Sequence, residues 1–222
     1  MTFSRVALFH ALAWIESLLA LHSYHYFVLT HREQGYGGPW KYLTYLNMVL
    51  QLIYFSLCVG KDLVDYLKLR NVSNVMKNIN DVAYAAVALP STITVFVSFW
   101  AIYLIDREMI HPEELDEFIP QWANHMWHTA ILVTIAESYF NNHKYPRRLV
   151  SLTVCSFFGL LYVAAIFWIH HEAGFWVYPF MDHLHGVWMV LFIVAELVFT
   201  WVCYFIGEAI NSYARNTDIK VE

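Results

Sequence analysis

Residues 186–207 read GVWMVLFIVAELVFTWVCYFIG, and this stretch decides the class of fold. Glu196 is its only charged residue. An α-helix needs about 20 consecutive apolar residues to cross the roughly 30 Å hydrocarbon core of a bilayer. The stretch therefore predicts a transmembrane helix.

Other apolar runs of similar length precede it in this chain of 222 residues. The composition is 59% hydrophobic and 14% charged, whereas a soluble domain averages about 45–50% apolar and about 25% charged residues. We therefore predict an all-α polytopic membrane protein, a single domain over residues 1–222 that forms a bundle of six transmembrane helices. The predicted spans are residues 5–28, 40–60, 82–105, 120–140, 149–169 and 186–207.

The distribution of basic residues predicts the orientation. With a cytosolic N-terminus, ten Lys and Arg residues lie on the cytosolic side, and only Arg32, Lys41 and Arg107 lie on the other. Cytosolic loops of membrane proteins are enriched in Lys and Arg, so we expect both termini in the cytosol. The expected location is the endoplasmic reticulum or the plasma membrane. Cys58, Cys155 and Cys203 fall near the reducing cytosolic side, and we expect free thiols there.

The fourth predicted span carries an unusual stripe of polar residues. Residues 120–137, PQWANHMWHTAILVTIAE, place polar side chains at three- and four-residue spacing, which puts them on one helical face. The second span carries a similar stripe, and both helices run inward from the outer side. At 1.5 Å rise per residue, Thr44 lies roughly 6 Å below the start of its span and His128 roughly 12 Å below its own. Helix tilt covers that gap, so we expect the two side chains to meet in the outer leaflet if the two polar faces are apposed. The two stripes are Gln121, Asn124, His125 and His128, and Thr44, Asn47 and Gln51.

One interpretation is a nucleophile and its base. A threonine hydroxyl attacks an ester only if a neighbouring group takes its proton, and a neutral histidine within about 2.6–3.2 Å does so. Asn47, Asn124 or His125 would then donate a hydrogen bond to the developing oxyanion. The relevant parts of the spans contain no aspartate, so the residues support a dyad rather than a triad.

Two other interpretations involve a metal. In a zinc-dependent lipid hydrolase, His125 and His128 would be two ligands, with a third from His111, His171 or His183, although no HxxxH or HExxH spacing occurs. The second interpretation is a b-type haem held between histidines on facing helices, although the cytosolic half of the predicted bundle contains few histidines.

The polar residues can also be structural. Thr44 would then bond the carbonyl of Trp40, four residues earlier, and His128 would be an interhelical hydrogen-bonding residue. A lipid-binding or signalling membrane protein without enzymatic activity would have such residues. We expect the buried Glu16, Glu137 and Glu196 to be packing or folding partners.

Four segments resemble the androgen-induced gene 1 / androgen-dependent TFPI-regulating protein family. The segments are YGGPWKYLTYLNMVLQ (36–51), DREMIHPEELDEFIPQWANHMWHT (106–129), WVYPF (176–180) and GEAINSY (207–213). They occur in the family's order, and the match spans nearly the whole chain. The segment 106–129 is the longest and most specific. At His111 the family has tyrosine, and at Ala123 it has a bulkier apolar residue.

The resemblance implies a multi-pass membrane hydrolase of fatty acid esters of hydroxy fatty acids, with a threonine nucleophile, a histidine and no added cofactor. Carried onto this sequence, the threonine is Thr44 and the histidine is His128. We expect Arg107 to pair with a lipid carboxylate or with its acidic neighbours. The expected partners are the membrane and a lipid ester that enters from it, and no nucleic acid.

Overall fold

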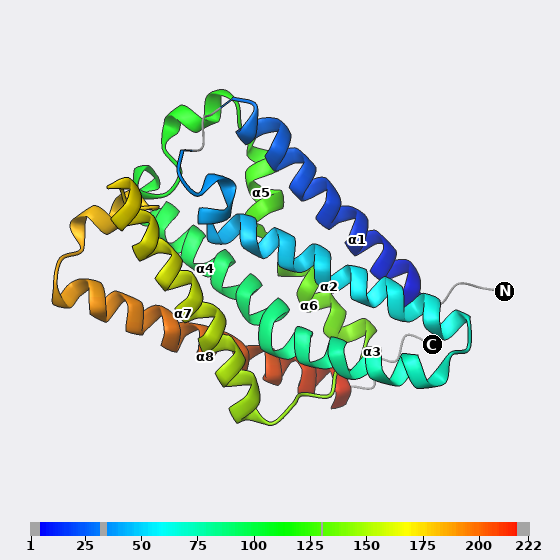
Figure 1. Ribbon diagram of the computed structural model, residues 1–222. Coiled ribbons are helices and arrows are strands. Elements are labelled where there is room, and N and C mark those ends of the chain that lie inside the picture. Colours follow the sequence, from blue (N-terminus) through cyan, green and yellow to red (C-terminus); the bar gives the residue numbers. More distant parts are fainter. Residues whose placement is uncertain (1–4, 32–34, 130, 217–222) are drawn as a thin grey trace.

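The computed structural model describes residues 5–31, 35–129 and 131–216, and every regular element in these ranges is helical. Eight α-helices occur, joined by short 3-10 or π-helical turns (Figure 1). The α-helices are α1 (Arg5–Tyr24), α2 (Leu43–Tyr66), α3 (Arg70–Ala83), α4 (Leu89–Ile105), α5 (Gln121–Thr129), α6 (Ile131–Phe140), α7 (Arg148–Ala173) and α8 (Val187–Asn216).

Five helical segments are long and apolar enough to cross a membrane. The first is α1 with the π-helical turn that follows it, and the third joins α3 to α4 through the π-helical turn Tyr84–Ala88; α2, α7 and α8 are the others. Most of the apolar windows of α7 and α8 face outward, with only 17% of each buried, as expected where lipid surrounds a helix. The chain is therefore an all-α, multi-pass integral membrane protein.

The fourth predicted span falls on α5 and α6, which lie on either side of residue 130. They follow one another across the bundle (Figure 1), but neither alone reaches membrane-spanning length. The sixth crossing therefore stays a prediction. α1 begins, and α8 ends, at the end of the bundle where α3 lies (Figure 1); the side of the membrane that this end faces also stays a prediction.

A proline lies just after the π-helical turn between α3 and α4. Pro90 has no N–H, so it cannot bond the carbonyl of Ala86 four residues earlier. The Cys155 thiol of α7 donates to that carbonyl instead, at 3.0 Å. The irregular turn thereby connects α4 to α7. Cys155 is a free buried thiol, as are the other two cysteines, which confirms the prediction.

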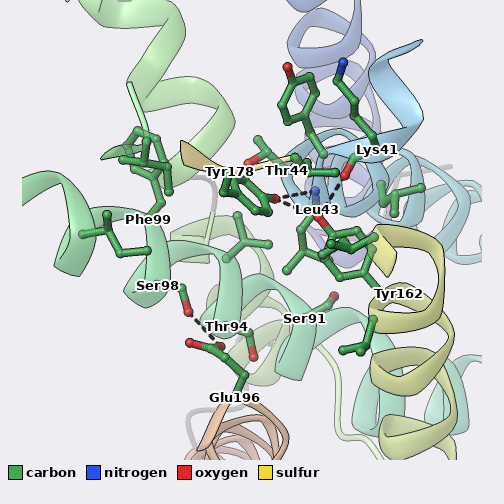
Figure 2. Close-up of a pocket in the computed structure, with 18 of the residues that line it drawn as sticks. Lys41, Leu43, Thr44, Ser91, Thr94, Ser98, Phe99, Tyr162, Tyr178 and Glu196 are labelled. Carbon is green, nitrogen blue, oxygen red and sulfur yellow. Dashed lines mark hydrogen bonds between the residues drawn. The ribbon is translucent and has the colours of Figure 1, made fainter. Parts of the chain in front are cut away.

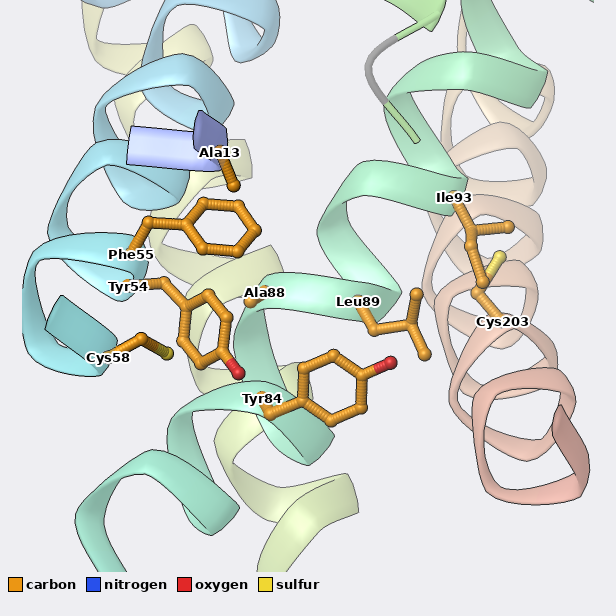
Figure 3. Close-up of a cluster of buried hydrophobic side chains, with 9 residues drawn as sticks. All are labelled: Ala13, Tyr54, Phe55, Cys58, Tyr84, Ala88, Leu89, Ile93 and Cys203. Carbon is orange, nitrogen blue, oxygen red and sulfur yellow. The ribbon is translucent and has the colours of Figure 1, made fainter. Parts of the chain in front are cut away.

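A cluster of buried apolar side chains fixes the centre of the bundle. It joins α1, α2, the start of α4 and α8, with Phe55 and Leu89 almost fully buried (Figure 3). A second cluster packs α5 against α1 and α2 and includes Trp127. Because α2 belongs to both clusters, its N-terminal turn, which contains Thr44, is held in a fixed position against α5.

Candidate active site

Thr44 and His128 are in direct contact. The Thr44 Oγ1 and His128 Nε2 atoms are 3.1 Å apart. Thr44 lies in the first turn of α2, and His128 is buried in the last turn of α5. The two helices come together because the apolar cluster around Trp127 packs one against the other.

A backbone hydrogen bond sets the protonation of the imidazole. The His128 Nδ1 atom lies 2.9 Å from the carbonyl oxygen of Asn124. A carbonyl only accepts hydrogen bonds, so Nδ1 carries the proton and Nε2 of the neutral ring presents its lone pair. The Thr44 hydroxyl therefore donates to Nε2, which is the arrangement that a nucleophile and its general base require.

An aromatic ring fixes the plane of the imidazole. Phe99 of α4 stacks on His128 with a centroid separation of 3.4 Å and an interplanar angle of 9°. Phe99 is only 5% exposed, so its own position is determined by packing. The imidazole is held by the stacked ring on one face and by the Asn124 carbonyl at one edge.

Two tyrosines hold the N-terminus of α2 next to the histidine. The Leu43 N–H donates to the Tyr178 hydroxyl at 3.0 Å. The Tyr162 hydroxyl donates to the carbonyl of Lys41 at 2.9 Å and lies 2.8 Å from the Tyr178 hydroxyl. Residues of α7 and of the segment before α8 therefore fix the turn that carries Thr44.

The Thr44–His128 pair opens onto a cavity of about 490 Å³. Thr44, Leu43 and the two tyrosines lie along one side of it, and Ser98 and Glu196 lie at another (Figure 2). The Ser98 hydroxyl donates to a Glu196 carboxyl oxygen at 3.3 Å. Most of the remaining lining is apolar, including Val95, Ile102, Leu115, Ile119, Val163, Ile166, Phe192 and Leu197. The volume lies in the range of small-molecule sites.

The other predicted oxyanion donors lie elsewhere. The Asn47 side-chain oxygen accepts from Ser91 at 3.0 Å and from Thr92 at 3.3 Å, so this amide connects α2 to α4. Asn124 supplies its main-chain carbonyl to His128, while its side-chain oxygen is buried without a partner among the described residues. His125 is exposed and stacks on Trp100 with a centroid separation of 4.9 Å.

Arg107 lies in the loop that covers one side of the cavity. It donates to Asp116 at 2.7 Å and to the carbonyl of His111 at 3.3 Å. Burial raises the pKa of Asp116, but hydrogen bonds from Arg107 and His111 outweigh this and hold that pKa below its usual range. Arg107 was predicted to pair with a lipid carboxylate or with neighbouring acidic residues, and in the structure it pairs with the acidic residue Asp116.

The zinc interpretation lacks a third ligand in the described part of the chain. No histidine, cysteine or carboxylate there joins His125 and His128 to form a three-ligand group. Neither the position of Phe99 on the imidazole nor the tyrosine clamp on α2 was predicted from the sequence. The WVYPF segment, which contains Tyr178, was the one signal that could have indicated the clamp.

Comparison with known proteins gives the family. The family model described as FAR-17a/AIG1-like protein matches residues 6–212. The androgen-induced gene 1 protein of Homo sapiens is 36% identical over 86% of this chain and 83% of its own length. The androgen-dependent TFPI-regulating protein of Mus musculus is 33% identical over 82% of this chain and 80% of its own. No solved structure matches the chain. The family match covers nearly all of the bundle, and the chain belongs to the FAR-17a/AIG1-like family.

Proposed function

We propose that this protein hydrolyses the ester bond of fatty acid esters of hydroxy fatty acids, with Thr44 as nucleophile and His128 as general base. The observation that carries the proposal is the 3.1 Å contact between Thr44 Oγ1 and His128 Nε2. The carbonyl that fixes the imidazole tautomer and the cavity next to the pair add support. The substrate class comes from the family resemblance of the segments around Thr44 and His128.

The reaction has two steps. His128 Nε2 takes the Thr44 proton as Oγ1 attacks the ester carbonyl carbon, and the tetrahedral intermediate then releases the hydroxy fatty acid, whose oxygen receives that proton. Water then gives a proton to His128 and attacks the acyl-threonine. The bond between the acyl carbon and Thr44 breaks, the fatty acid leaves, and the threonine regains its proton.

We assign the oxyanion site to the first turn of α2. The first N–H groups of a helix have no intrahelical acceptor. In α2, the Leu43 N–H bonds Tyr178 and the Leu46 N–H bonds the carbonyl of Tyr42. The amides of Thr44 and Tyr45 are the remaining donors of this turn, and the positive end of the helix dipole adds to their effect.

The polar pair on another side of the cavity fits the second polar group of this substrate. A fatty acid ester of a hydroxy fatty acid has a free carboxyl group as well as its ester. Ser98 and Glu196 provide hydrogen-bonding groups in a mostly apolar cavity, and we assign them to the neutral carboxylic acid. The protein should therefore hydrolyse a substrate with a free carboxyl group faster than the same substrate with that carboxyl group methylated. Glu196→Ala should reduce this difference in rate.

The test is covalent labelling with a fluorophosphonate that mimics an acyl group. The wild-type protein in detergent should be labelled on the peptide that contains Thr44, and Thr44→Ala should abolish both labelling and hydrolysis. Ser91→Ala is the matched control, because Ser91 is a hydroxyl of the same cavity that donates to Asn47 instead of a base. Full labelling of correctly folded Thr44→Ala would overturn the proposal.

His128→Ala and His125→Ala separate the dyad from the zinc alternative. The dyad predicts that His128→Ala abolishes hydrolysis and that His125→Ala retains most of it, because His125 is exposed, stacks on Trp100 and is not among the residues that line the cavity. A zinc site built on both histidines predicts equal losses. Absence of labelling and of hydrolysis in the folded wild-type protein would favour a lipid-binding protein without enzymatic activity.

A further inference from the structure

A second group of buried ionisable side chains lies far from the Thr44–His128 pair. Its members are His10 of α1, Cys58 of α2, Glu137 of α6 and His143 of the loop after α6, and each is at most 1% exposed. Cys58 follows Thr44 by 14 positions along α2, which at 1.5 Å per residue is about 21 Å along the helix axis. The proposed ester chemistry uses none of these side chains.

Three of these side chains bring their donor atoms together. The potential ligand atoms of His10, Cys58 and Glu137 all lie within 4.8 Å of one another. The His10 Nε2 atom is 3.1 Å from one Glu137 carboxyl oxygen, and the His143 Nε2 atom is 2.9 Å from the other. An imidazole nitrogen, a carboxylate oxygen and a thiol therefore come together from three helices, while His143 of the loop holds the second carboxylate oxygen.

Each histidine is also held from behind by a second carboxylate. The His10 Nδ1 atom lies 2.6 Å from Asp62, and the His143 Nδ1 atom lies 3.1 Å from Asp81. Histidines that bind metals typically donate their other ring N–H to a carboxylate, which fixes the tautomer and orients the ring. Here two histidines have this support, and both direct Nε2 toward Glu137.

The count of protons points to a cation. An ionised carboxylate only accepts hydrogen bonds, and a neutral histidine has one N–H. His10 and His143 each lie between two carboxylates, so each needs two protons or a cation in place of the second. One divalent ion replaces the second proton of His10 and the thiol proton of Cys58 at the same total charge. His143 keeps both of its protons and bonds Asp81 and Glu137.

Asn80 gives an independent indication. This residue of α3 is 2% exposed, and its side-chain N–H donates to the Cys58 sulfur at 3.8 Å. The oxygen of the same amide is buried without a hydrogen-bond partner among the described residues. A thiolate would accept from this N–H more strongly than a thiol, which accounts for the orientation of the amide toward Cys58.

We propose that His10, Glu137 and Cys58 bind one divalent transition-metal ion with a water molecule as the fourth ligand, and that His143 holds the Glu137 carboxylate in place. Zinc suits this mixture of nitrogen, oxygen and sulfur donors and is bound tetrahedrally with bonds of about 2.0–2.3 Å. That geometry separates neighbouring ligand atoms by about 3.3–3.6 Å. The His10 Nε2 atom and the Glu137 carboxyl oxygen, now 3.1 Å apart, would need to move apart by a few tenths of an ångström.

The ion would connect the helices at this end of the bundle. Its ligands come from α1, α2 and α6, with Asp62 supporting His10. His143 of the loop after α6 connects Glu137 to Asp81 of α3. The Asp62 side chain is 18% exposed, which provides a route from the surface. Since the site is remote from Thr44, its role is to stabilise the bundle, and the ester chemistry does not depend on it.

The test measures metal content and a spectroscopic signature. The full-length protein in detergent is treated with a chelator, loaded with zinc or cobalt(II), freed of excess ion and analysed for metal. The wild type should hold about one ion per chain, and the cobalt form should show a near-ultraviolet sulfur-to-cobalt charge-transfer band. Cys58→Ser should lose that band, whereas Cys203→Ser, which changes another buried thiol, should keep it.

Asp62→Asn keeps the test informative if a ligand variant does not fold. It retains every ligand and weakens only the support of His10, so it should lower zinc affinity by about 10–100-fold. A folded wild type that takes up no zinc or cobalt under these conditions overturns the proposal. A full charge-transfer band in Cys58→Ser does so as well. Neither readout depends on hydrolytic activity.

Discussion

Replacing Phe99 with leucine tests whether the stacked ring positions the catalytic imidazole. Phe99 lies 3.4 Å from His128, centroid to centroid, and nearly parallel to it. An aromatic pair contributes about 0.5–1.5 kcal/mol beyond its buried area. If all of this holds His128 in its reactive orientation, Phe99→Leu lowers kcat by about 2- to 12-fold, since 1.36 kcal/mol is tenfold in rate. Loss of packing at this buried position lowers the free energy of unfolding by about 1–3 kcal/mol.

The assay is steady-state hydrolysis of a fatty acid ester of a hydroxy fatty acid, with thermal unfolding measured on the same samples. Phe192→Leu is the matched control, because Phe192 also lines the cavity but belongs to α8 and packs against Phe180. The control should raise KM and leave kcat nearly unchanged. If Phe99→Leu keeps kcat within twofold while unfolding confirms the lost packing, the stacked ring does not position His128.

Two further substitutions test the packing around α2 and α8. Gly207→Ala should lower the free energy of unfolding by about 1–3 kcal/mol, because the added methyl group would lie 2.7 Å from a methyl of the fully buried Leu89. Thermal unfolding checks this, with Gly60→Ala as the control that meets only a flexible methionine end at 3.2 Å. Tyr178→Phe removes the acceptor of the Leu43 N–H, at a cost of about 1–3 kcal/mol, and should lower kcat. Hydrogen exchange should then rise in the first turn of α2, and unchanged exchange there would exclude the clamp.

The sequence predicts the membrane-spanning helices well because each signal is local. A run of apolar residues indicates a span wherever its neighbours lie, and α2, α7 and α8 coincide with predicted runs. The third span was predicted less completely. Its helical segment begins at Arg70 instead of residue 82 and contains a π-helical turn just before Pro90. That turn has a partner on another helix, Cys155, which the sequence does not indicate.

The contact between Thr44 and His128 could be anticipated in outline, since helical phase and the depth of each residue along its predicted span allowed the two side chains to meet. The features that make the contact chemically useful were not readable. The tautomer depends on a backbone carbonyl, which every residue has, and the stacking of Phe99 depends on how α4 packs against α5. For Glu137 the sequence predicts only a packing or folding role, because one of its partners, His10, is distant in sequence.

The hydrogen-bond partners of the polar side chains of α2 distinguish the proposed nucleophile from the residues that connect helices. Asn47 accepts from two hydroxyls of α4, and Gln51 accepts from Thr134 of α6 at 3.0 Å. Those amides connect neighbouring helices, as polar side chains in membrane proteins commonly do. Thr44 instead meets an imidazole whose free lone pair faces it, and both side chains line the cavity. Among these polar positions of α2, Thr44 is therefore the one whose surroundings fit the proposed nucleophile.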